Sequence, residues 1–193
     1  MFRKVIIFAV SLLLILSMPG CTTQEQEDPE YLSERLFSAD FDRNYQILVT
    51  ITKDVAGLTE SSDPKVEGAV SFVRDELFYS TYPYHIASIT TYNGGDTSFI
   101  PESVCESVDY YYQTYQQYFK SLDTYLQSNE GISENVKAKI QQLDDFLPTE
   151  LHTLVKRNLF KLEAFEEVEV NEWLQTIADK MLAVVDAIEL ELS

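Results

Sequence analysis

The sequence has few of the residues that most metal sites and nucleotide-binding loops need. Its two histidines are His85 and His152, and the residues three positions before them are Tyr82 and Thr149, so the Glu-x-x-His motifs of a di-iron site are missing. The two cysteines, Cys21 and Cys105, lie far apart in the chain, so the paired-cysteine motifs of zinc and covalent haem are missing. Six scattered glycines form neither a P-loop nor a dinucleotide-binding fingerprint. We therefore expect no metal and no cofactor.

Positive charge is also scarce. The chain has 14 lysines and arginines against 32 aspartates and glutamates, a net charge of −18. Residues 1–20 contain two bases and no acid, so the remainder carries 12 minus 32, or −20. Such a chain is not attracted to nucleic acid phosphates or to anionic lipid headgroups. With 45% hydrophobic residues in a length of 193, it is nevertheless expected to fold as one domain.

The polar residues do not form a recognisable catalytic set. Cys105 and His85 could pair as nucleophile and base, but nothing in the sequence supports that pairing, and we expect Cys105 to be a half-buried, inert thiol. Asp144 and Asp145 are successive residues of a predicted helix. Because successive helical residues do not face each other, these two are solvated charges and not an acid–base couple. We therefore expect a protein without catalytic activity.

The first 21 residues have the organisation of an export signal. Arg3 and Lys4 precede an apolar run over residues 5–16, and small residues follow before Cys21. The stretch LSMPGC over residues 16–21 resembles the lipobox of prokaryotic lipoproteins. In that family the cysteine takes a thioether-linked diacylglycerol and becomes the new N-terminus. The resemblance therefore implies lipid attachment at Cys21 and a location on the extracytoplasmic face of the cell envelope.

Two other interpretations of this segment stay open. The apolar run could be a retained, uncleaved anchor, although it is short for a membrane span, which needs about 20 residues. Cys21 could also be an incidental cysteine behind an ordinary cleavage site. If Cys21 does carry lipid, Cys105 is the one remaining thiol, and no disulfide can form within the chain.

The signal is followed by a short polar segment. Residues 22–30, TTQEQEDPE, contain four acids and no large apolar side chain, which predicts a solvated tether. When extended, this tether spans on the order of 30 Å, so the folded part stays close to the bilayer. The predicted organisation is a signal peptide over 1–20, a lipidated cysteine with an acidic, disordered tether over 21–30, and a single α-helical domain over 31–193.

Beyond the tether, apolar residues recur at intervals of three and four, which predicts helices throughout. These helices cover about 31–58, 64–77, 101–128, 133–147, 151–165 and 171–188, with a short helix and a loop within 79–100. Asp63, Ser133 and Asn171 are expected to cap three of them. Because short connections favour antiparallel neighbours, the expected fold class is an all-α antiparallel bundle of about five to six helices.

The most unusual stretch is rich in tyrosine, YYYQTYQQYF over residues 110–119. On a helix, Tyr111 and Tyr115 fall at the centre of the apolar face. Tyr112 and Tyr118 fall at its margin, and Tyr110 points away. The simplest interpretation is a core with a rim, because a tyrosine at the rim buries its ring and keeps its hydroxyl in water.

These tyrosines leave two hypotheses about function open. In the first, the chain is a membrane-anchored lipoprotein whose non-catalytic helical domain is a protein-interaction module, and its partners are the membrane and another envelope protein. In the second, it binds or senses a small ligand, aromatic or cationic in view of the charge of −20. A ligand or partner surface would then be lined by Tyr112 and Tyr118, joined by Tyr82 and Tyr84 if residues 79–92 fold over them.

Overall fold

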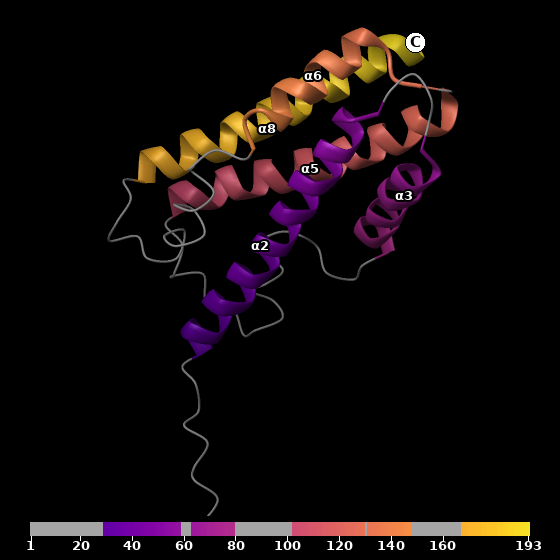
Figure 1. Cartoon of the computed structure of the whole chain (residues 1–193). Coiled ribbons are helices and arrows are strands. Elements are labelled where there is room, and N and C mark those ends of the chain that lie inside the picture. The colour runs from indigo at the N-terminus through magenta and orange to yellow at the C-terminus, as the bar shows by residue number, and fades with distance from the viewer. Residues whose placement is uncertain (1–28, 59–62, 80–101, 130, 148–166) are drawn as a thin grey trace, which may run out of the picture.

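A computed structural model describes residues 29–58, 63–79, 102–129, 131–147 and 167–193, which contain five helices and no strand (Figure 1). The helices are α2 (Pro29–Ala56), α3 (Pro64–Tyr79), α5 (Glu102–Ser128), α6 (Glu134–Asp144) and α8 (Glu167–Leu192). The predicted all-α helical bundle is thereby confirmed. The predicted signal peptide, the short helix and loop that follow α3, and the helix over 151–165 lie outside the described residues. Among the helices described, none combines the length and the apolar character needed to cross a membrane.

Two helices begin at their predicted caps. Ser133 has an extended backbone, with φ −65° and ψ 156°, and its side-chain oxygen accepts a hydrogen bond from the Val136 N–H at the start of α6. Asp63 accepts one from the Lys65 N–H at 2.9 Å, and Pro64 is the first residue of α3. A side-chain oxygen at the cap satisfies one of the N–H groups that the first helical turn leaves without a partner.

Two other predicted boundaries were wrong. Helix α2 begins at Pro29, so Pro29 and Glu30, the last two residues of the predicted tether, belong to the helix. Proline has no N–H to satisfy and a φ suited to a helix, which makes it a good first residue. Helix α8 begins at Glu167, four residues before the predicted cap Asn171, and Val170 lies buried within it. Glutamate is a good helix former, so the sequence EVEV extends the helix past the capping signal.

Among the described helices, the most extensive contact joins α5 and α8, which run parallel. Their side chains meet in matching order along both helices, at Ser107 with Gln175, Tyr110 with Asp179, and Tyr125 with Glu191. The expected antiparallel packing instead describes α6 against α8, where Ser133 meets Glu191 and Lys180 lies over the Phe146 ring. Because α6 separates α5 from α8 in sequence, the chain can return and place α8 parallel to α5.

The remaining two helices pack on this group from other sides. Figure 1 shows α2 crossing α5 at an angle, with its Pro29 end away from the other helices. It contacts α6, and in the turn just after α6 the Leu147 carbonyl oxygen accepts a hydrogen bond from the Tyr45 hydroxyl. Helix α3 packs on α5 and touches α2. Helix α5, about 40 Å long by the rise per residue, is therefore the central element of the fold.

The predicted apolar faces form the core. All seven residues assigned to one face of α5 are buried: Val104, Val108, Tyr111, Tyr115, Phe119, Leu122 and Leu126. The assigned faces of α6 and α8 are buried as well: Val136, Ile140, Leu143, Leu147, Trp173, Leu174, Ile177, Met181, Val184 and Ile188. On α2 the described members of the predicted face are also buried: Phe41, Tyr45, Leu48, Thr52 and Val55.

Candidate functional site

The tyrosines predicted at the margin of the core lie inside it. Tyr112 is 1% exposed and Tyr118 is 0% exposed, so the prediction that they form a rim or a binding surface was wrong. The reason is α2, which crosses α5 on that flank. The Tyr112 ring meets Phe41 of α2 edge-on at 6.2 Å between centroids, and the Tyr118 hydroxyl lies 3.1 Å from the Thr52 hydroxyl. A second neighbouring helix widens the buried arc beyond the one that the apolar spacing predicts.

The other predicted tyrosines have mixed outcomes. Tyr111 and Tyr115 lie at the centre of the buried face, as predicted. Tyr110 does not point away into solvent: it is half-buried, and its hydroxyl donates to an Asp179 carboxylate oxygen at 3.1 Å. Tyr82 and Tyr84, the other two members of the predicted surface, lie outside the described residues, as do both histidines.

The buried rings form one continuous aromatic cluster at the crossing of α2, α5 and α8. Phe41 lies 5.4 Å from Tyr111 and 6.5 Å from Trp173, between ring centroids. Tyr45 lies 5.5 Å from Trp173, and Tyr115 lies 4.8 Å from Phe119. These centroid separations fall within the range of interacting aromatic pairs. The tyrosine-rich stretch therefore holds three helices together in the core.

The phenol hydroxyls of this cluster differ in their hydrogen bonding. The Tyr45 hydroxyl donates to the Leu147 carbonyl oxygen, whereas the Tyr111 hydroxyl is buried with no hydrogen-bond partner. Burial raises the pKa of Tyr111 well above its ordinary value, with a smaller contribution from the neighbouring Tyr45. Burial also raises the pKa of Tyr118. These phenols therefore stay protonated at neutral pH and do not serve as bases.

A polar groove between α5 and α8 is the strongest candidate site among the described residues. Its volume is about 370 Å³. It is lined by two rows of side chains, one from each helix: Glu106, Ser107, Tyr110, Asn171, Gln175 and Asp179. The α8 residues recur every four positions, which places them on one face of the helix, opposite the row from α5. The parallel packing of the two helices thus builds the groove.

Hydrogen bonds tie the two walls of the groove together. The Gln175 side-chain amide donates to the Ser107 hydroxyl at 3.4 Å, and the Tyr110 hydroxyl donates to Asp179. Ser107 is only 3% exposed, so the floor of the groove is polar and well buried. The Asn171 side-chain oxygen is buried without a hydrogen-bond partner. The groove therefore offers acceptors that a ligand with N–H or O–H donors can satisfy.

The charge of the groove is negative. Its lining contains two carboxylates, Glu106 and Asp179, and no lysine or arginine. Burial raises the pKa of Tyr110, and so do its hydrogen bond to Asp179 and the charges of Asp179 and Asp186. Within the described residues no group of three or more histidines, cysteines or acids has the arrangement of a metal site. A small organic cation with several donors matches this lining better than an anion.

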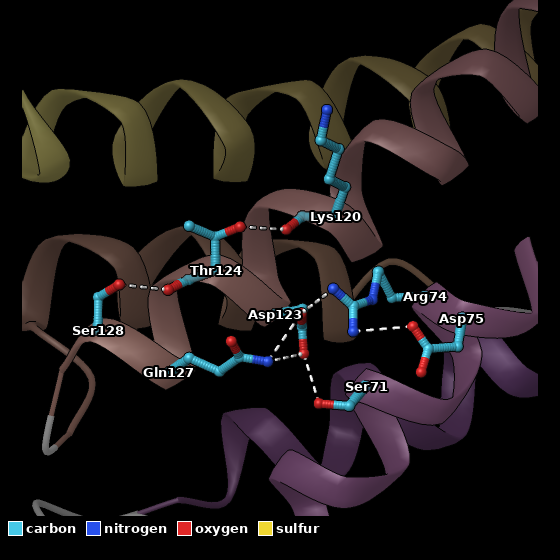
Figure 2. A network of polar contacts seen from close by, with 8 residues as sticks. All are labelled: Ser71, Arg74, Asp75, Lys120, Asp123, Thr124, Gln127 and Ser128. Atoms are coloured by element: carbon cyan, nitrogen blue, oxygen red, sulfur yellow. Dashed lines mark hydrogen bonds and ion pairs between the residues drawn. The ribbon is translucent and has the colours of Figure 1, made fainter. Parts of the chain in front are cut away.

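Sequence reasoning missed one buried charge. Asp123 of α5 is 3% exposed and faces α3, where it meets Ser71 and Arg74, as Figure 2 shows. In the sequence it is one of 32 acids, and its partners lie about fifty residues earlier. The one local signal is Gln127, four residues later, whose amide donates to both carboxylate oxygens at 3.0 Å. Cys105, in contrast, lies half-buried on the flank of the core, as predicted.

The chain has no detectable similarity to known proteins. No family model matches the chain, and no curated protein or solved structure is similar to it at a significant level. The groove between α5 and α8, the buried Asp123 and the lipobox-like sequence around Cys21 are the features from which a function has to be inferred.

Proposed function

We propose that this protein is a lipoprotein of the cell envelope, attached to a membrane through lipid on Cys21, whose helical domain acts by binding and not by catalysis. The observation that carries the proposal is the sequence LSMPGC at residues 16–21, directly behind a basic start and an apolar run. The fold supports the second half of the proposal, because a helical bundle with exposed polar faces can present a contact surface to another envelope protein.

The anchor and the first helix are close together in the chain. Eight residue steps separate Cys21 from Pro29, the first residue of α2. A fully extended chain of this length spans at most about 30 Å. The helical domain of a lipidated chain is therefore held next to the bilayer, and its charge of −20 keeps it from adhering to anionic headgroups.

Cell fractionation with a matched pair of variants tests the anchor. The chain has two cysteines, so Cys21→Ser removes the lipidation site and Cys105→Ser serves as a control that leaves it intact. We expect the wild-type protein and Cys105→Ser to partition with membranes, and Cys21→Ser to be released or mislocalised. Membrane association that is the same in all three proteins would favour the uncleaved anchor and refute lipid attachment.

The groove between α5 and α8 supports a second candidate function, the binding of a small organic cation. A ligand module needs a concave site with convergent polar groups, and this groove has both. It replaces the tyrosine surface that the sequence predicted, since Tyr112 and Tyr118 are buried. Diamines are suitable probes, because their two ammonium groups supply donors and positive charge to Glu106 and Asp179.

Calorimetric titration with diamines tests this candidate. Asp179→Asn removes a groove carboxylate, whereas Glu189→Gln removes an exposed acid ten residues further along α8 that does not line the groove. We expect the first variant to lose most of the binding and the second to keep it. Equal loss in both variants would indicate attraction by net charge alone, and absence of binding to the wild-type protein would refute the candidate.

A further inference from the structure

A single buried carboxylate joins α3 to the rest of the bundle. Asp123 lies on the side of α5 that faces α3, and the structure leaves 3% of it exposed. A buried carboxylate is costly unless hydrogen-bond donors or positive charges surround it. The identity of those donors therefore decides what holds Asp123 in place.

Two of the three side chains that contact Asp123 come from α3 (Figure 2). The Ser71 hydroxyl donates to one carboxylate oxygen at 2.5 Å, and an Arg74 guanidinium nitrogen lies 3.1 Å from the other. The third contact, from Gln127, belongs to α5 itself. When α3 is in place, Asp123 is satisfied; when α3 leaves, Asp123 keeps Gln127 and gains water.

Arg74 has a second carboxylate on its own helix. A guanidinium nitrogen of Arg74 lies 2.8 Å from Asp75, which is half-exposed. Arg74 itself is about one third exposed. Its charge therefore remains paired and hydrated if the contact with Asp123 breaks. The polar contact between α3 and α5 can open without leaving an uncompensated charge on either helix.

The described apolar contacts of α3 are limited. Among its described side chains, residues 64–75, Val70 and Val73 are buried, and Val66 and Ala69 are partly buried against the core. Phe72 is 61% exposed. The hydroxyls of Thr124 and Ser128, near Asp123 on α5, donate to carbonyl oxygens of their own helix and not to α3. Helix α3 contacts α5 and α2. Phe72, the aromatic residue among its described side chains, is exposed and lies outside the aromatic cluster that joins α2, α5 and α8.

We propose that α3 is a lid on α5, which is released as a unit while the rest of the bundle stays folded, and that Asp123 is the latch that holds it closed. Release exchanges the contacts from Ser71 and Arg74 for water and uncovers the face of α5 that carries Asp123. The lid is independent of the membrane anchor and of the groove between α5 and α8.

Hydrogen exchange of the full-length protein in detergent, followed by mass spectrometry, tests the lid. In the wild-type protein, amides within residues 66–75 of α3 should exchange at least tenfold faster than those within 177–188 of α8. Asp123→Asn should raise the α3 rates at least a further tenfold and change the α8 rates less than twofold. Ser71→Ala removes one of the two contacts from α3 and should give the same selective effect at smaller size.

Asp75→Asn is the matched control, because Asp75 contacts the same arginine from the exposed side of α3. It should leave the α3 rates within twofold of the wild type. Equal acceleration of α3 and α8 in Asp123→Asn and Ser71→Ala would overturn the proposal, because Asp123 would then stabilise the whole fold. Wild-type α3 amides as slow as those of α8 would also overturn it. If Asp123→Asn does not fold, the selectivity of Ser71→Ala decides between these outcomes.

Discussion

The Tyr111 hydroxyl is the clearest place to test the packing of the core. It is buried at the centre of the aromatic cluster and has no hydrogen-bond partner. In the unfolded chain the same hydroxyl is bonded to water, so folding takes those bonds away without replacing them. The substitution Tyr111→Phe removes the hydroxyl and keeps the ring, and it should therefore stabilise the protein.

The size of the effect follows from the cost of burying a polar group. A buried donor or acceptor without a partner costs about 1–3 kcal/mol, and part of this cost is regained when the group is deleted. We expect Tyr111→Phe to raise the free energy of unfolding by about 1 kcal/mol. For a chain of this length, that corresponds to a rise in melting temperature of about 2–4 °C.

Tyr45, in the same cluster, provides a control for which the free energy of unfolding should change in the opposite direction. Its hydroxyl donates to the Leu147 carbonyl oxygen, and Leu147 is itself 1% exposed. Tyr45→Phe deletes an identical hydroxyl but leaves that buried carbonyl without its donor. We expect it to lower the free energy of unfolding by about 1–3 kcal/mol.

Urea denaturation followed by circular dichroism at 222 nm measures both variants against the wild type. The slope of free energy against urea should stay constant, since neither change alters the surface exposed on unfolding. A loss of more than about 1 kcal/mol in Tyr111→Phe would refute the reasoning. It would show that the Tyr111 hydroxyl has a partner in the folded protein.

Three other predictions follow from the buried and titrating groups. Tyr112→Ala and Tyr118→Ala should each lower the free energy of unfolding by about 3–5 kcal/mol, because both rings lie in the core. Urea denaturation measures this change, and a loss below about 1 kcal/mol would place the rings at the surface. A hydrogen bond from Ser133 lowers the pKa of Glu191, so ionised Glu191 stabilises the fold above its ordinary pKa of 4.5, and this stabilisation is lost as the pH falls through the folded-state pKa. The difference in melting temperature between the wild type and Glu191→Gln should therefore shrink on acidification. Burial and the charge of Asp145 raise the pKa of Asp144, so ionised Asp144 opposes folding at neutral pH. The variant Asp144→Asn should therefore have a higher melting temperature than the wild type at pH 7. This difference should shrink at lower pH, where Asp144 becomes protonated.

The helices could be predicted because their signals are local. The apolar face of α5 follows from residues spaced three and four apart, and the caps at Asp63 and Ser133 act on amides two or three residues away. These features depend on the backbone geometry of one helix. They hold whichever helices pack beside it.

The features that sequence reasoning missed depend on which helices meet. The burial of Tyr112 and Tyr118 requires α2 to cross α5 on one particular flank, and nothing in the spacing of α5 specifies that crossing. Asp123 is distinguished from other acids by α3, which is distant in sequence. The groove requires α5 and α8 to run parallel, whereas short connections had predicted antiparallel neighbours.

The most direct test of the central claim is the mass of the N-terminal peptide of the protein purified from its native membrane. Lipid attachment predicts a peptide that begins at Cys21 and carries a thioether-linked diacylglycerol. A peptide that begins at Met1, or one in which Cys21 is present and unmodified, would contradict the account.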